Sequence, residues 1–181
     1  MRRLGALQPK AGALHDAESL SVRGGGARRA RMGAAVEARR HVELALKHLE
    51  EGKALADKDP ARASEKLYKA AEEAVKALAL HFGLSDVLEK VEKRGRWTVT
   101  ELEKAASRIS GRLGGWFSAA WDRANYLRVW GFHEAKLDAD SVKERAPDIE
   151  RMVLEARRIL SSERAATRKG RSPAALGAPA R

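Results

Sequence analysis

Between residues 59 and 83, apolar side chains recur at steps of three and four residues, which is the spacing of one face of an α-helix. Most of this face is alanine: Ala63, Leu67, Ala70, Ala71, Ala74, Leu78 and Phe82. Asp59 is a favourable N-cap, and Pro60 suits the first position of a helix. Gly83 is suited to end it. The pattern therefore predicts a helix with a defined beginning and end and a buried face of small side chains.

The chain on either side of this helix also has a helical period. Residues that favour strands are few, with three Ile and three Thr in the whole chain. Only WTVT at 97–100 looks extended. Further helices are expected at about 34–57, after Ser85, at about 115–130 and from Pro147, with a short turn at 141–145. Thr98 and Glu101 form a possible capping box for one more helix, which ends near Gly111. The predicted fold class is all-α, an up-and-down bundle of four main helices plus one or two short helices.

Positive charge is concentrated at the two ends of the chain. The net charge is +11 over 181 residues, and residues 1–31 and 164–181 contribute +5 each. The 132 residues between them are almost neutral and contain one Asn, no Gln and no Cys, a composition typical of hyperthermophile proteins. The basic character is therefore weak evidence that the folded body binds nucleic acid.

The same composition predicts three segments. Residues 1–31 have no sustained helical period, so we expect a disordered extension, or upstream DNA read in frame with Met32 as the natural start. The alternative for this segment is a basic arm that adds affinity for phosphates. Residues 32–163 are expected to form the helical bundle domain. Residues 164–181, rich in Arg, Ala, Gly and Pro, are expected to be a disordered basic tail.

Aromatic side chains gather in one short segment. Six of the nine aromatic residues lie within 116–132: Trp116, Phe117, Trp121, Tyr126, Trp130 and Phe132. One helix cannot bury six aromatic side chains on a single stripe, because Trp116, Trp121 and Tyr126 point in different directions around its axis. Burial in the core, a dimer interface and a platform for stacking nucleobases remain open. The candidates for a binding site or dimer interface are Trp116, Trp121, Tyr126 and Trp130.

The same segment contains the candidate catalytic pair. His133 follows Arg128 by five residues. Arginine supplies a permanent cation for a phosphate, and histidine is a general acid or base near neutral pH. Together they would support metal-free attack of a ribose 2′-OH on its phosphodiester. The alternative is a solvated arginine on a helix and a histidine that caps the chain after Gly131.

Other patterns in the body predict no further site. Solvated ion pairs within one helix are expected among Glu72, Glu73, Lys69 and Lys76. His41 and His48 are seven residues apart, too far to chelate one metal ion directly, and no carboxylate pattern completes a site. The absence of Cys excludes disulfides and zinc–thiolate sites. No metal and no cofactor are therefore expected.

Two stretches of the chain are similar to the archaeal PaREP family of type one. They are ASEKLYKAAEEAVKALA at 63–79 and YLRVWGFHEAKLDADSVKERAPDIERMV at 126–153. The resemblance covers about 36–160 and leaves both basic ends outside. It implies an archaeal cytoplasmic protein but no particular activity.

The helical hairpin around the DKDP link, with Tyr68 and Ala70-Ala71 in its second helix, resembles the HEPN class of helical bundles. That resemblance implies a bundle that often dimerises. Its active members cleave RNA without a metal and carry an Arg followed, four to six residues later, by a His. Arg128 and His133 match this spacing. Active members commonly have a polar residue directly after the Arg, and the valine here, Val129, argues against catalysis.

These observations predict a small cytoplasmic homodimer that serves as a binding or interaction module for nucleotide or RNA. One alternative is a metal-independent ribonuclease of a toxin–antitoxin pair. Another is a structural helical adaptor with a protein partner. No apolar run approaches the roughly 20 residues that a membrane-spanning helix needs, so no membrane partner is expected.

Overall fold

The computed structural model describes residues 16–169 of the chain. Its helices are α1 (Asp16–Leu55), α2 (Pro60–His81), α3 (Ser85–Arg94), α4 (Val99–Leu113), α5 (Trp116–Tyr126), the π-helix η1 (Leu127–His133) and α6 (Ala139–Lys169). No strand occurs between residues 16 and 169, so the predicted all-α class is confirmed. The chain divides into two compact units, Met1–Gly33 and Ala34–Arg181, and every side-chain contact described below lies in the second.

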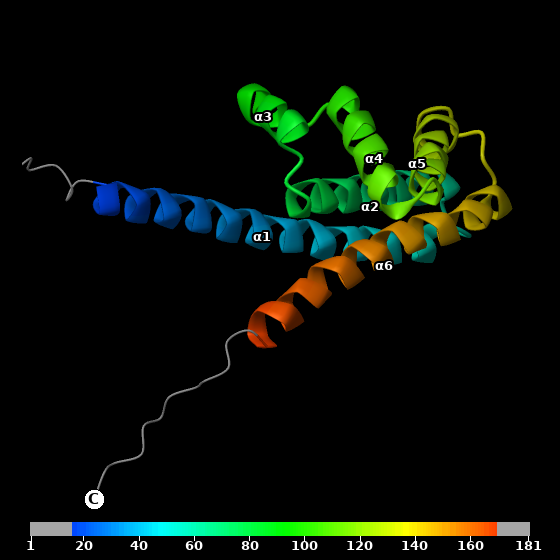
Figure 1. The fold of residues 1–181 in the computed structure, drawn as a ribbon. Helices are drawn as coiled ribbons and strands as arrows, with labels where there is room; N and C mark the ends of the chain where they lie inside the picture. Colours follow the sequence, from blue (N-terminus) through cyan, green and yellow to red (C-terminus); the bar gives the residue numbers. More distant parts are fainter. Residues whose placement is uncertain (1–15, 170–181) are drawn as a thin grey trace, which may run out of the picture. The chain divides into compact units, whose positions relative to one another are not determined.

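Helix α2 is the central helix of the second unit. Eleven of its 22 residues are buried, and six of these are alanines. It packs against α3, α4, α5, η1 and α6, and the part of α1 from Ala34 onward runs alongside it (Figure 1). Its predicted ends are confirmed, because the Arg62 backbone N–H donates to Asp59 Oδ1 over 3.0 Å and Gly83 has a φ of +60°.

Two glycines mark where neighbouring helices approach α2 most closely. A Cβ atom added at Gly52 of α1 would lie 2.8 Å from Cγ of Leu67. One added at Gly131 of η1 would lie 2.5 Å from Cβ of Ser64 and overlap its hydroxyl. Both distances are shorter than van der Waals contact, so only glycine permits this packing.

Helix boundaries differ from the predicted ones at both ends of the bundle. Helix α1 begins at Asp16 rather than near residue 34, and it runs through the three glycines at 24–26. Helix α6 begins at Ala139 and includes the predicted turn and Pro147. Completely buried residues on both sides of this proline, Val142 and Ile149, hold the helix in place. The domain boundaries near 31 and 164 stay predictions, and residues 170–181 lie outside the described part.

The middle of the chain shows two further differences. The segment expected to be extended, 97–100, runs into α4, which begins at Val99. The predicted capping box is replaced by a contact between side chains, because the Thr98 hydroxyl donates to the carboxylate of Glu101 instead of capping the backbone. Arg94 Nη1 also donates to this buried carboxylate, over 3.2 Å. Glu101 therefore joins α3 to α4.

The close contact at Gly131 gives a first prediction. Gly131→Ala should lower the free energy of unfolding by about 1–3 kcal/mol, because the added methyl group overlaps Ser64. Urea unfolding followed by circular dichroism measures the change.

The matched control is Gly111→Ala in α4, where an added Cβ meets nothing within 4 Å. That variant should be unchanged or gain up to about 1 kcal/mol from helix propensity. Equal stability of the two variants would show that η1 does not pack tightly on α2.

Candidate functional site

The residues that the sequence singled out lie on α5 and η1, which follow one another without a break. The Glu134 backbone N–H donates to the carbonyl of Val129 over 2.9 Å, which is the i to i+5 bond of a π-helix. Immediately after η1 the chain turns at Ala135, whose φ of +48° lies in the left-handed region. π-Helical turns and strained residues are both rare, and both occur frequently at functional sites. The segment 126–136 is therefore the first place to look for function.

The six clustered aromatic residues divide between the core and the surface. Phe117 and Trp121 are buried, and Trp121 Nε1 donates to Glu103 over 2.9 Å. Trp116 is half-buried, with the guanidinium of Arg151 3.9 Å from its ring centroid. Trp116 and Trp121 thus have partners within the fold, and the candidates for an outer surface are the aromatic residues after α5.

Four large apolar side chains form that outer surface, which we call the η1 surface: Tyr126, Val129, Trp130 and Phe132. They are half of the eight large apolar side chains that are exposed among residues 26–162, and each is 37–44% exposed. Two cations border the surface. The guanidinium of Arg145 lies 4.6 Å from the ring centroid of Tyr126, and Lys136 Nζ lies 5.4 Å from that of Trp130.

Arg128 lies on the opposite, inward side of η1. Its Nη1 donates to Tyr68 Oη over 2.9 Å, and its guanidinium lies 4.8 Å from the centroid of the Tyr68 ring. Tyr68 is buried on α2, and its ring centroid lies 5.9 Å from that of Trp121. The guanidinium is therefore held at one edge and one face by a neutral aromatic residue.

The charge of Arg128 has no carboxylate partner among the side chains of residues 26–162. The half-buried lysines Lys66, Lys69 and Lys76 each have a glutamate oxygen at 2.6 Å. Arg128 is half-buried as well, but its side-chain hydrogen bond goes to the phenol of Tyr68 and not to a carboxylate. Because cations removed from water are normally paired, this guanidinium is ready to accept an anion.

The phenol of Tyr68 does not neutralise Arg128. Burial raises the pKa of Tyr68, and the nearby charge of Glu72 raises it further. The charge and hydrogen bond of Arg128 lower the pKa but do not outweigh these two effects. The phenol is therefore uncharged at neutral pH, and the full positive charge of Arg128 remains available.

His133 is exposed at the end of η1, with its ring centroid 5.0 Å from that of Phe132. Within the part of the chain that the structure describes, no hydrogen bond or ring contact joins it to Arg128. The two residues are nonetheless five positions apart in a helix whose hydrogen bonds link residues five positions apart. They belong to consecutive turns of η1.

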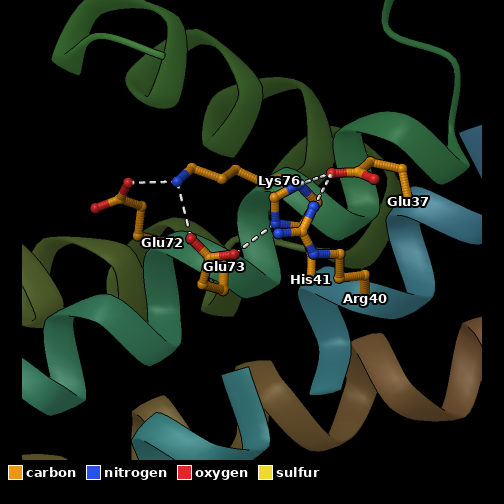
Figure 2. Close-up of polar contacts among 6 residues, drawn as sticks. All are labelled: Glu37, Arg40, His41, Glu72, Glu73 and Lys76. Atoms are coloured by element: carbon orange, nitrogen blue, oxygen red, sulfur yellow. Dashed lines mark hydrogen bonds and ion pairs between the residues drawn. The ribbon is translucent and has the colours of Figure 1, made fainter. Parts of the chain in front are cut away.

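A second polar cluster joins α1 to α2 (Figure 2). His41 Nδ1 lies 2.5 Å from Glu73 Oε2, and Lys76 Nζ lies 2.8 Å from the other oxygen of Glu73 and 2.6 Å from Glu72. The side chains of Glu73 and Lys76 are only 13% exposed, so the prediction of solvated pairs was wrong for them. The reason is that α1 covers this side of α2, which the sequence of α2 cannot reveal.

This cluster has its hydrogen-bonding groups in mutual contact, which favours a structural role. Burial alone would raise the pKa of Glu73, but the hydrogen bonds from His41 and Lys76 outweigh burial and hold the pKa below its ordinary value. Among the side chains that the structure describes, those of residues 26–162, no three His, Cys, Asp or Glu are placed together to hold a metal ion. The cluster therefore fastens two helices.

The lowered pKa of Glu73 gives a second prediction. Its pairing stabilises the fold above the ordinary glutamate pKa of 4.5, and this stabilisation is lost as the pH falls from there through the lower folded-state value. Glu73→Gln should lower the free energy of unfolding at neutral pH by about 3 kcal/mol, because His41 and Lys76 lose a buried carboxylate. It should also reduce the loss of stability below pH 4.5. Urea unfolding at several pH values tests both.

The exposed Glu89 on α3 provides the matched control. Glu89→Gln should change stability by less than about 0.5 kcal/mol at any of these pH values. A Glu73→Gln variant that behaves like Glu89→Gln would show that the cluster contributes nothing to the fold.

The helices between Asp16 and Lys169 include none with both the length and the apolar character needed to cross a bilayer.

Comparison with known proteins gives a family and a fold. A family model described as the archaeal PaREP1/PaREP8 family matches residues 40–153. A crystal structure of a protein from Sulfolobus solfataricus is 34% identical, with a TM-score of 0.58, and the match covers 62% of this chain and 92% of that one. A solution structure of the same target, described as the Orf c02003 protein, is also 34% identical, with a TM-score of 0.56 and coverage of 62% and 87%. No curated protein matches the chain.

Proposed function

The chain belongs to the archaeal PaREP1/PaREP8 family, as its sequence suggested, and from the geometry of η1 we propose that it is a homodimeric binding module for RNA or a nucleotide in the archaeal cytoplasm. In this proposal Arg128 holds a phosphate group of the ligand. Three residues of the η1 surface, Val129, Trp130 and Phe132, make contact with the second copy.

One observation supports Arg128 as the phosphate-binding residue: it is half-buried and positively charged, and its side-chain partner is the neutral phenol of Tyr68, to which it donates a hydrogen bond. Arginine binds phosphate through two parallel N–H groups, and the bond to Tyr68 uses only Nη1. The ring of Tyr68 supports one face of the guanidinium, so little side-chain freedom is lost when an anion binds. Tyr68 is thus the positioning residue for Arg128.

The binding test uses the full chain and a labelled single-stranded RNA, with fluorescence anisotropy at about 200 mM salt to weaken contacts made by the basic ends. Arg128→Ala should weaken binding about tenfold or more, because a charged hydrogen-bonded contact is lost. Arg39→Ala removes an exposed arginine of α1 and should change affinity less than about twofold. Circular dichroism checks that both variants are folded. If both variants bind the RNA equally well, Arg128 is not part of the binding site. If the parent protein does not bind RNA, the result favours a structural adaptor with a protein partner.

A metal-independent ribonuclease is the second candidate function, and the π-helical register of Arg128 and His133 favours it. His133 would take the proton from a ribose 2′-OH as that oxygen attacks the adjacent phosphorus, and Arg128 would stabilise the developing charge on the phosphate. The bond from phosphorus to the 5′-oxygen then breaks, which leaves a 2′,3′-cyclic phosphate and a 5′-hydroxyl protonated from His133 or water. The same RNA, incubated in chelator, should then be cut by the parent and left intact by His133→Ala. Binding without cleavage by the parent would support the binding module over the enzyme.

The η1 surface supports the homodimer. Exposed aromatic residues with a polar border are typical of the centre of a protein interface, and Arg145 and Lys136 form such a border here. The rings of Tyr126 and Trp130 are neighbours, with centroids 6.3 Å apart, and exposed apolar patches are uncommon on monomers unless they bind something.

The dimer is tested by sedimentation velocity of the parent and two charge variants. The parent should sediment as a dimer at micromolar concentration, and Trp130→Glu should sediment as a monomer because it places a charge in the interface. Val99→Glu changes a valine of α4 that is 51% exposed, and it should remain dimeric. A monomeric parent, or a dimeric Trp130→Glu variant, would contradict this interface.

A further inference from the structure

A hollow lies between α5 and α6, beside the η1 surface. Its volume is about 340 Å³, and it is lined by Asp122, Arg123, Tyr126, Glu144 and Arg145. This volume is at the lower end of the range for sites that bind small molecules. The hollow would therefore hold one planar group of the size of a nucleobase.

Two planar groups of the lining are positioned for stacking. The ring of Tyr126 is 41% exposed, and the guanidinium of Arg145 lies 4.6 Å from its centroid. Arg145 is held in this position, because its Nη1 donates to the carbonyl of Ser141 over 2.7 Å. Unstacked bases bind to proteins by stacking on aromatic rings and on arginine guanidinium planes, and this lining offers both.

The charged side chains that line the hollow differ in whether they have a partner within the protein. Arg123 is paired with Asp148, and Glu144 lies 3.6 Å from Arg145 with its side chain 79% exposed. The carboxylate of Asp122 makes no hydrogen bond or ion pair with any residue of the described 26–162 segment. Asp122 is exposed, so water satisfies its oxygens in the free protein, and both oxygens can accept hydrogen bonds from a ligand that enters the hollow.

We propose that this hollow is a recognition site for guanine. Guanine is the base that presents two adjacent donors, N1–H and the 2-amino group, to the two oxygens of one carboxylate. Adenine and cytosine place an acceptor beside their amino group, and the single N–H of uracil lies between two carbonyl oxygens. A carboxylate therefore selects guanine, while its ring stacks on the exposed part of the Tyr126 side chain, whose ring already contacts the Arg145 guanidinium. An organic cation is the competing occupant, because the Asp122 carboxylate lacks a cationic partner, and a diamine tests it below.

This inference rests on the proposed function, since it names the base that an RNA or nucleotide ligand would present. It adds a site, because Asp122 and Arg145 have no part in holding the phosphate at Arg128. Guanosine, which has no phosphate, separates the two sites experimentally.

Isothermal titration of the full chain with guanosine 5′-monophosphate and with the adenosine, cytidine and uridine monophosphates tests the proposal. The guanine nucleotide should bind about tenfold more tightly than the others, which is the discrimination expected of one bidentate pair. Asp122→Asn should abolish this preference, because the new amide offers only one acceptor oxygen. Tyr126→Leu should weaken binding of all four nucleotides. Glu92→Gln, on the exposed side of α3, is the control and should change nothing.

Four outcomes separate this proposal from the preceding one. Guanosine binding that is preserved in Arg128→Ala supports the guanine site whether or not RNA binding depends on Arg128. RNA binding that depends on Arg128, together with equal affinity for the four nucleotides, overturns the guanine site alone. A preference for guanine that survives Asp122→Asn also overturns it. Binding of a diamine such as putrescine in place of the nucleotides would assign the hollow to an organic cation.

Discussion

The close packing around α2 is the constraint on which the rest of the second unit depends. Alanine occupies six of its buried positions, so helices on several sides approach its backbone more closely than larger side chains would allow. Gly131 of η1 allows the same close approach from the other side of the contact, because its missing Cβ leaves room for Ser64 of α2. The distance between η1 and α2 then decides which side chains of η1 face inward and which remain in solvent.

One stripe of α2 contributes to two polar sites, the His41–Glu73 cluster and the Arg128 site. Tyr68, Glu72 and Lys76 are spaced four residues apart, so their side chains lie on one face of the helix. At one end of the stripe Lys76 is neutralised by two glutamates, and the cluster fastens α1. At the other end Tyr68 meets Arg128 and supplies no charge. The same helix thus provides a structural contact to α1 and, through Tyr68, the support for the Arg128 cation of η1.

The π-helix connects this inward cation to the outward aromatic surface. Within seven residues it places Leu127 in the core, Arg128 against Tyr68, and Val129 and Trp130 in solvent. A ligand phosphate at Arg128, a second copy at the η1 surface and a base in the neighbouring hollow would therefore bind to one continuous part of the chain.

The sequence alone determined the helical class, the ends of α2 and the family, because these depend on local periodicity, capping residues and short motifs. It also identified Arg128, His133 and the aromatic cluster as the unusual features. It could not decide which aromatic residues are buried, since Trp121 and Trp130 differ only in what packs against them.

Only the tertiary structure decided that Glu73 and Lys76 are sheltered by α1 and that Arg128 rests on a phenol. It also revealed the hollow beside Tyr126, which is built from two helices. Each of these properties arises between residues that are distant in the sequence. Burial and the partners of a charge are set by the packing of whole helices, which the spacing within any one helix does not specify.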